Sequence, residues 1–145
     1  RMVCNEKLRQ LGSDTYRLTI TIKSFSYKKG YPHDISGNGG GYIFDCRCLP
    51  NPGRYEQYKQ MTGKDAEVIA FLEKEPEVEE FYAAAKSLVM QSIRRYKQRH
   101  FTNLSVYFGC TGGRHRSVYM AQRLATELQK DEELDVQVSH VEQNG

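Results

Sequence analysis

Apolar and polar residues alternate along four stretches of the chain, which is the pattern of strands that bury one face in a core. Leu18, Ile20 and Ile22, for example, recur at every second position and would share one face of a strand. Two prolines follow the second stretch and would end its pairing. The predicted strands cover residues 16–25, 42–47, 103–108 and 134–141.

Apolar residues recur at helical spacing in other segments. Asp65 stands where an N-cap residue would begin one helix, and Pro76 stands in the first turn of a longer one. Glycines at residues 36–41 predict a flexible loop inserted between two strands. The predicted helices cover residues 3–11 within an N-terminal helical extension at 1–15, residues 65–72, roughly two dozen residues from Pro76, and residues 117–130.

This order of strands and helices, without an internal repeat or a linker, predicts one α/β domain over residues 1–145. The expected architecture has three layers and a mainly parallel sheet. The 145 residues suffice for a proper core, and 39% hydrophobic with 27% charged residues is the composition of a soluble globular protein. We expect neither a membrane span nor a signal peptide.

The strongest chemical signal lies between the third strand and the last helix. A strand, a glycine-bearing turn and a helix start aim backbone N–H groups and the positive end of the helix dipole at one point. Arginine and histidine side chains add donors there, and a bound anion would relieve the conflict between their charge and the dipole. The alternative is an ordinary loop followed by a solvated helical turn. The candidate phosphate-binding residues are Cys110, Thr111, Gly112, Gly113, Arg114, His115, Arg116 and Ser117.

A charged pair near the end of the second strand adds to this site. Asp45 and Arg47 would share one face of that strand, opposite Cys46 and Cys48. Ligands of open α/β sheets bind beyond the carboxyl ends of the strands, where this pair would lie. The alternative is a mutual ion pair that only fixes the following loop.

The remaining composition narrows the class of protein. Four cysteines lack the spacing of a zinc site, so we expect no metal and no cofactor, and reduced thiols in the cytoplasm. Cys4, Cys46 and Cys48 are interpreted as small apolar residues. A net charge of +3 permits anionic ligands without indicating nucleic acid. The basic run at residues 94–100 is either an RNA or phosphate patch or a set of cations at a helix C-terminus.

One reading of the turn is catalytic. Cys110, Arg116 and Ser117 have the Cys-x5-Arg-Ser spacing of cysteine-dependent phosphatases. In such a loop a thiolate attacks phosphorus, the arginine grips phosphate with two hydrogen bonds, and the helix start lowers the thiol pKa. Asp45, or His115 in its place, would be the acid that protonates the leaving oxygen.

A longer resemblance leads to another reading. The stretch at 109–118 looks like the GCTGG[K/R/Q]HRSV signature of the C-terminal domain of the RapZ family of RNase adaptor proteins. Residues 44–52 resemble that family's FD-x-R-F-LPNP block, and residues 24–30 its SFGFKYG segment. Residues 62–65 are similar to its TGLD turn. These motifs occur in the family's order, and the resemblance extends over residues 24 to about 140.

The resemblance implies a fold akin to a phosphofructokinase subdomain that senses glucosamine-6-phosphate without phosphatase activity. Lys28, Asp45, Arg47, the 110–117 loop and His140 would line the sugar-phosphate site. RNA, a protein or a second copy of the chain are further expected partners. The sequence departs from the family at Gly53, where some relatives have a histidine, and it contains no G-x-x-x-x-G-K-[ST] nucleotide loop.

The sequence therefore predicts, in this order, a non-catalytic sensor of an amino-sugar phosphate or similar anion, a cysteine-dependent phosphatase, and an RNA-binding adaptor.

Overall fold

Four parallel strands form one sheet in the order β2–β3–β1–β4 in the computed structural model, which describes residues 16–142. The strands are β1 (Leu18–Ser26), β2 (Tyr42–Asp45), β3 (Asn103–Cys110) and β4 (Leu134–His140). Because every strand runs in the same direction, all four carboxyl ends lie at one edge of the sheet. The predicted α/β fold with a parallel sheet is confirmed.

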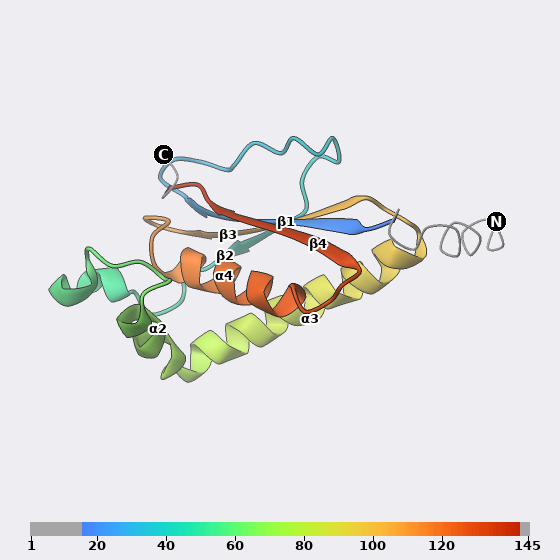
Figure 1. Cartoon of the computed structure of the whole chain (residues 1–145). Coiled ribbons are helices and arrows are strands. Elements are labelled where there is room, and N and C mark those ends of the chain that lie inside the picture. The colour runs from blue at the N-terminus through green and yellow to red at the C-terminus, as the bar shows by residue number, and fades with distance from the viewer. Residues whose placement is uncertain (1–15, 143–145) are drawn as a thin grey trace.

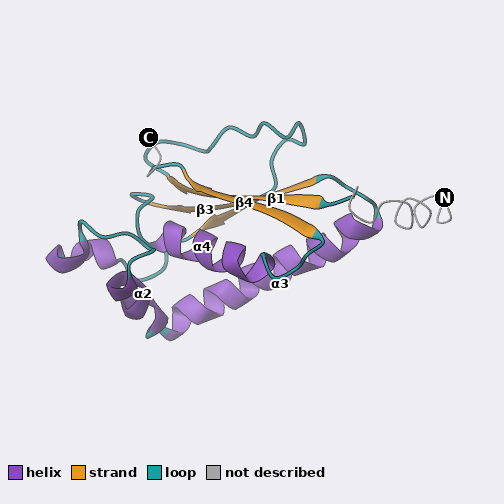
Figure 2. Ribbon diagram, in the orientation of Figure 1, coloured by secondary structure: helices purple, strands orange, loops and turns teal. Residues whose placement is uncertain are grey.

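Three α-helices cover one face of this sheet (Figure 1). They are α2 (Ala66–Glu73), α3 (Pro76–Gln98) and α4 (Arg116–Leu128), and two short 3-10 turns, η1 (Pro52–Arg54) and η2 (Glu56–Tyr58), precede them. The connection between β1 and β2 crosses the opposite face (Figure 2). The third layer of the domain is therefore this connection and not a layer of helices.

The core lies between the sheet and the helices. Leu18, Ile20 and Ile22 are fully buried on the helix-facing side of β1, as their alternation predicts. Thr19, Thr21 and Lys23 line a hollow of about 440 Å³ on the other side, beneath the β1–β2 connection. The glycine-rich segment belongs to this connection, and Asp34 fixes it by accepting a hydrogen bond from the Gly40 N–H at 2.7 Å.

The second strand is shorter than its pattern predicts. β2 ends at Asp45, and the next residues form a turn in which the Leu49 N–H donates to the Cys46 carbonyl at 3.2 Å. The prediction that Asp45 and Arg47 share a strand face is therefore wrong. Cys46 is buried as expected, but Cys48 is exposed, so the interpretation of Cys48 as a small core residue is also wrong.

The helix boundaries agree with the capping signals. Asp65 is the N-cap of α2 and Pro76 is the first residue of α3. The Asp65 carboxylate does not bond to its own helix; it accepts from the Thr62 N–H at 2.7 Å and closes the preceding turn. The predicted helix at residues 3–11 and Cys4 lie outside the described residues.

Candidate anion-binding site

The residues singled out by the sequence gather at the carboxyl edge of the sheet. The register places Ser26 of β1 beside Cys110 of β3, and Asp45 of β2 beside Gly109. His140 ends β4 and lies opposite Ser24. Four strands thus deliver their last residues to the edge where α/β sheets bind ligands.

The turn between β3 and α4 is locked onto β1. The Ser26 hydroxyl donates to the Thr111 carbonyl at 2.6 Å, and the Tyr27 N–H donates to the Cys110 carbonyl at 3.0 Å. Gly113 has a φ of 67°, and a Cβ there would lie 2.9 Å from the Ser26 nitrogen. Only glycine combines a positive φ with the absence of a Cβ, which explains why the second glycine of the turn, Gly113, stands there.

The Cys110 sulfur lies inside this turn. Its thiol donates to the Ser117 hydroxyl at 3.2 Å, and its residue is only 2% exposed. Burial by itself would raise the pKa of the Cys110 thiol. Three opposing contributions outweigh burial: the hydrogen bond with the Ser117 side chain, the N–H groups of Ser117 and Gly113, and the charge of Arg116. The pKa of Cys110 is therefore below its ordinary value. The turn therefore favours a negative charge at its centre.

Arg116 is buried at the first position of α4, with 5% of its surface exposed. One guanidinium nitrogen, Nη1, donates to the Arg47 carbonyl at 2.9 Å and to the Leu49 carbonyl at 3.0 Å. Within residues 16–142 its buried Nε has no hydrogen-bond partner. A buried donor without a partner is costly, so this nitrogen is a candidate ligand contact.

Arg116 lines a polar hollow of about 460 Å³ at this edge, called here the Arg116 hollow. Three arginines and one carboxylate, that of Glu77 in α3, line the hollow. Its lining residues are Arg47, Cys48, Leu49, Pro50, Asn51, Arg54, Glu77, Thr111 and Arg116.

Asp45 and Arg47 form the ion pair that the sequence allowed as an alternative. Arg47 donates to both carboxylate oxygens of Asp45, through Nε at 2.9 Å and Nη2 at 2.7 Å. These bonds lower the pKa of Asp45 more than burial raises it, and the Arg116 charge adds to the lowering. The Arg47 guanidinium also lies 3.9 Å from the ring centre of Tyr27. Through Arg47 the pair links the turn after β2 to the segment after β1, while its charges stay partly exposed.

Two basic residues of the turn bind the chain instead of facing the hollow. Arg114 donates to the Met61 and Gln60 carbonyls, both at 3.0 Å. His115 Nε2 lies 2.9 Å from the Tyr58 carbonyl, and burial is the largest cause that lowers the His115 pKa. Both side chains tether the segment before α2 to the turn.

The other predicted site residues lie apart from the hollow's lining. Lys28 is exposed just beyond β1. His140 is buried, with Nδ1 2.7 Å from the Ser24 hydroxyl and Nε2 3.0 Å from Gln122 Oε1. Burial lowers the His140 pKa, and the charge of Lys64 lowers it further. His140 therefore stabilises the end of β4 from within the fold.

Asn51, Arg54 and Glu77 were not predicted as site residues. Asn51 caps η1 by accepting from the Gly53 N–H at 2.9 Å, so the LPNP-like segment shapes one wall of the hollow. That segment was the available signal for Asn51, and Arg54 follows two residues after its end. Glu77 carried none, because an acidic residue in the first turn of a helix is common.

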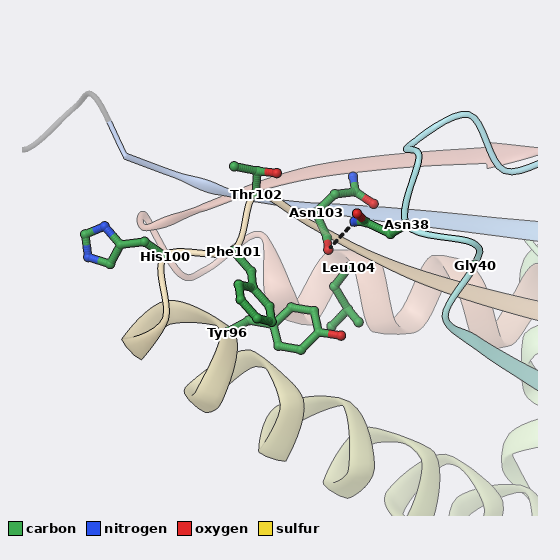
Figure 3. A pocket seen from close by; sticks show the side chains of 8 residues that line it. All are labelled: Asn38, Gly40, Tyr96, His100, Phe101, Thr102, Asn103 and Leu104. Atoms are coloured by element: carbon green, nitrogen blue, oxygen red, sulfur yellow. Dashed lines mark hydrogen bonds between the residues drawn. The ribbon is translucent and has the colours of Figure 1, made fainter.

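A second hollow lies away from this site, where α3 ends and β3 begins (Figure 3). Its volume is about 460 Å³, and in the figure the rings of Tyr96 and Phe101 lie beside Leu104 while Asn38 reaches the Asn103 carbonyl. The basic run of residues 94–100 ends here. Lys97 of that run pairs with Asp131 at 2.7 Å and Glu133 at 2.9 Å, and is therefore engaged within the fold.

In residues 16–142 no group of three or more His, Cys, Asp or Glu side chains could hold a metal ion. None of the helices in the same range has the length and apolar character that a membrane crossing needs.

Together these features define a parallel α/β domain in which the turn between β3 and α4 places a buried cysteine, Cys110, near a buried arginine, Arg116. The chain belongs to the family of the RapZ C-terminal domain, whose model matches residues 18–144. The family resemblance carried by the four motifs is thereby confirmed.

Three relatives illustrate the match, and each is called a nucleotide-binding protein. That of Thioalkalivibrio sulfidiphilus is 34% identical over 137 residues, which cover 94% of this chain and 46% of the relative. That of Halorhodospira halophila is 42% identical over 113 residues, with coverages of 78% and 38%. That of Thiobacillus denitrificans is 39% identical over 124 residues, with coverages of 86% and 43%. The chain thus spans less than half the length of these relatives.

Proposed function

We propose that this domain binds a phosphorylated small molecule, an amino-sugar phosphate such as glucosamine-6-phosphate, and serves as a non-catalytic sensor of it. The single observation that carries the proposal is the unpaired, buried Nε of Arg116 in a polar hollow at the carboxyl edge. A phosphate oxygen would accept from this nitrogen and satisfy it. The helix dipole of α4 and the turn's N–H groups add to the attraction.

The charges of the hollow fit an amino sugar better than a plain sugar phosphate. Arg47, Arg54 and Arg116 supply positive charge for the phosphate, and Glu77 supplies one carboxylate. A protonated amino group on the sugar would pair with that carboxylate while the phosphate lies against the arginines. The family resemblance points to the same ligand class.

Differential thermal shift tests this proposal with four additives: glucosamine-6-phosphate, glucose-6-phosphate, glucosamine and inorganic phosphate. We expect the largest rise in Tm with glucosamine-6-phosphate and little with glucosamine, because stabilisation grows with ligand concentration relative to Kd. Glu77→Gln should abolish the preference for the amino sugar over glucose-6-phosphate. Equal shifts with glucosamine and its phosphate would contradict the proposal.

Two variants separate the hollow from general charge. Arg54→Gln removes an exposed arginine of the hollow, whereas Arg99→Gln removes an exposed arginine beyond the end of α3. We expect the first to weaken the shift and the second to leave it unchanged. A nucleoside triphosphate is a fifth additive, since the relatives are called nucleotide-binding proteins. A larger shift with the nucleotide would replace the amino-sugar assignment.

One observation favours a second candidate, a cysteine-dependent phosphatase: the donors of the turn lower the pKa of Cys110. The same structure supplies the acid poorly, because Arg47 lowers the pKa of Asp45 and keeps its carboxylate ionised near neutral pH. We therefore expect no turnover of an aryl phosphate. Phosphate release that disappears in Cys110→Ser, while ligand binding survives, would establish the phosphatase instead.

A further inference from the structure

Cys46 and Cys110 lie opposite each other where the neighbouring parallel strands β2 and β3 end. The register pairs Phe44 with Phe108 and Asp45 with Gly109, and the Cys46 N–H donates to the Gly109 carbonyl at 2.7 Å. In a parallel ladder, a residue donates its N–H to the carbonyl that comes one position before its register partner. Cys46 donates to the Gly109 carbonyl, so its register partner is Cys110. The pairing of β2 with β3 thus continues for one residue beyond the strand's end.

The two sulfur-bearing side chains point to the same side of the sheet. Side chains of register partners share a face, and two residues earlier the rings of Phe44 and Phe108 stack with centres 5.3 Å apart. Cys46 and Cys110 belong to the same buried cluster between sheet and helices. Both are free thiols.

The spacing suits a disulfide. Neighbouring strands lie about 4.7–4.9 Å apart. A disulfide needs a Cα–Cα separation of roughly 4.4–6.8 Å and converging Cβ atoms. Cys48, by contrast, is exposed in the turn after β2 and is not opposite Cys110 in the ladder.

We propose that Cys46 and Cys110 are an oxidation site that forms a reversible intrachain disulfide when the protein meets a peroxide. The inference does not depend on the proposed function, because it concerns only the two thiols and a small oxidant.

The reaction has two balanced steps. The Cys110 thiolate sulfur attacks one oxygen of hydrogen peroxide, an S–O bond forms, the O–O bond breaks, and hydroxide leaves. The Cys46 sulfur then attacks the Cys110 sulfur of the resulting sulfenic acid, the S–S bond forms and the S–O bond breaks. The second oxygen takes the proton of Cys46 and leaves as water, and the proton that Cys110 released on ionising converts the hydroxide of the first step to water. Two thiols are oxidised and one peroxide is reduced to two waters.

The environment decides which sulfur reacts first. The turn donors hold the pKa of Cys110 below its ordinary value, whereas burial raises the pKa of Cys46 well above it. The thiolate is the reactive form, so Cys110 is the residue that peroxide attacks and Cys46 is the resolving thiol. Thr111 and Gly112, the two residues that follow Cys110, are exposed, so a small oxidant can approach the turn from their side.

Peptide mapping tests the pairing directly, because trypsin cleaves after Arg47 and separates Cys46 from Cys48. The three relevant tryptic peptides are residues 30–47 with Cys46, residues 48–54 with Cys48, and residues 100–114 with Cys110. The folded chain is treated with hydrogen peroxide, blocked with iodoacetamide, digested without reductant and analysed by mass spectrometry. We expect peptides 30–47 and 100–114 to be linked with the loss of two hydrogen atoms, and dithiothreitol to release them.

Matched variants and an unfolded control complete the test. Cys48→Ala should retain the link, whereas Cys46→Ala should lose it and accumulate oxygen on Cys110. The urea-unfolded chain should lose the preference for Cys46 over Cys48, because only the fold sets Cys46 opposite Cys110. Links from Cys110 to Cys48 or Cys4 in the folded protein would overturn the proposal. So would oxygen additions on Cys110 without any link to peptide 30–47.

Discussion

Mild acid should destabilise the domain because two buried histidines would have to become charged. His115 and His140 are 7% and 6% exposed, and burial is the first cause that lowers the pKa of each imidazole. An unfolded histidine titrates near pH 6.5. The unfolded chain therefore takes up protons before the folded one, and stability falls as the pH drops from about 6.5 towards the folded pKa values. Above this window the stabilisation is fully present.

The magnitude follows from proton linkage. Each histidine that stays neutral in the fold but is charged in the unfolded chain lowers the free energy of unfolding by about 1.4 kcal/mol for each pH unit of acidification. Two such groups give at most about 3 kcal/mol per unit, which corresponds to a fall in Tm of roughly 6–12 °C for a chain of this size. The paired carboxylates do not obscure this effect. Asp45, for example, has a lowered pKa, so the stability that its ionised carboxylate contributes is lost only below about pH 4.

Circular dichroism melts at constant ionic strength between about pH 7.5 and pH 5 measure this slope. His140→Gln keeps a donor towards Gln122 and removes one titrating group, so we expect it to flatten the slope by roughly half. An unchanged slope in His140→Gln, or a wild-type Tm that does not fall across this window, would refute the reasoning.

Two further predictions concern Gly63, in the turn before α2, and the basic run at residues 94–100. Gly63→Ala should lower the free energy of unfolding by about 2–3 kcal/mol in urea titrations, because its Cβ would lie 2.3 Å from the His115 carbonyl oxygen and 2.5 Å from the Tyr119 nitrogen. Gly112→Ala is the matched control, since nothing lies within 4 Å of a Cβ there, and equal losses in both would contradict the packing argument. Any RNA binding by residues 94–100 should be weak, fall steeply with salt, and decrease in an Arg95→Gln, Arg99→Gln double variant in a filter-binding assay. A salt-resistant complex with a structured RNA would show that RNA recognition is a main function.

Most of the fold could be predicted because local patterns and tertiary contacts agree. Leu18, Ile20 and Ile22 alternate with polar residues and are buried. Pro76 is the first residue of α3, because the fixed φ of proline suits the first turn of a helix. The failure at the end of β2 has a physical cause. The alternation continues through Arg47, but its backbone N–H bonds to the Asp45 carboxylate two residues back, which competes with the ladder.

The candidate site could be predicted only in part, since sequence gives the position of a charged residue but not its hydrogen-bond partners. Arg114 and Arg116 look equivalent in the turn, yet one binds the carbonyls of residues 60 and 61 and the other is buried against those of residues 47 and 49. His140 likewise reaches the correct edge of the sheet but is buried there. Long-range contacts of this kind join segments some 50 to 70 residues apart, and no local pattern records them.

The proposed phosphate site and the proposed oxidation site meet at the same donors. The N–H groups of Gly113 and Ser117 and the charge of Arg116 stabilise a thiolate at Cys110. A phosphate in the turn would draw on the same groups and bring a like charge close to the sulfur, which raises the thiol pKa. The neutral thiol reacts with peroxide more slowly than the thiolate. If both proposals hold, a bound sugar phosphate protects Cys110 from oxidation, and the domain is most sensitive to peroxide when its ligand is scarce.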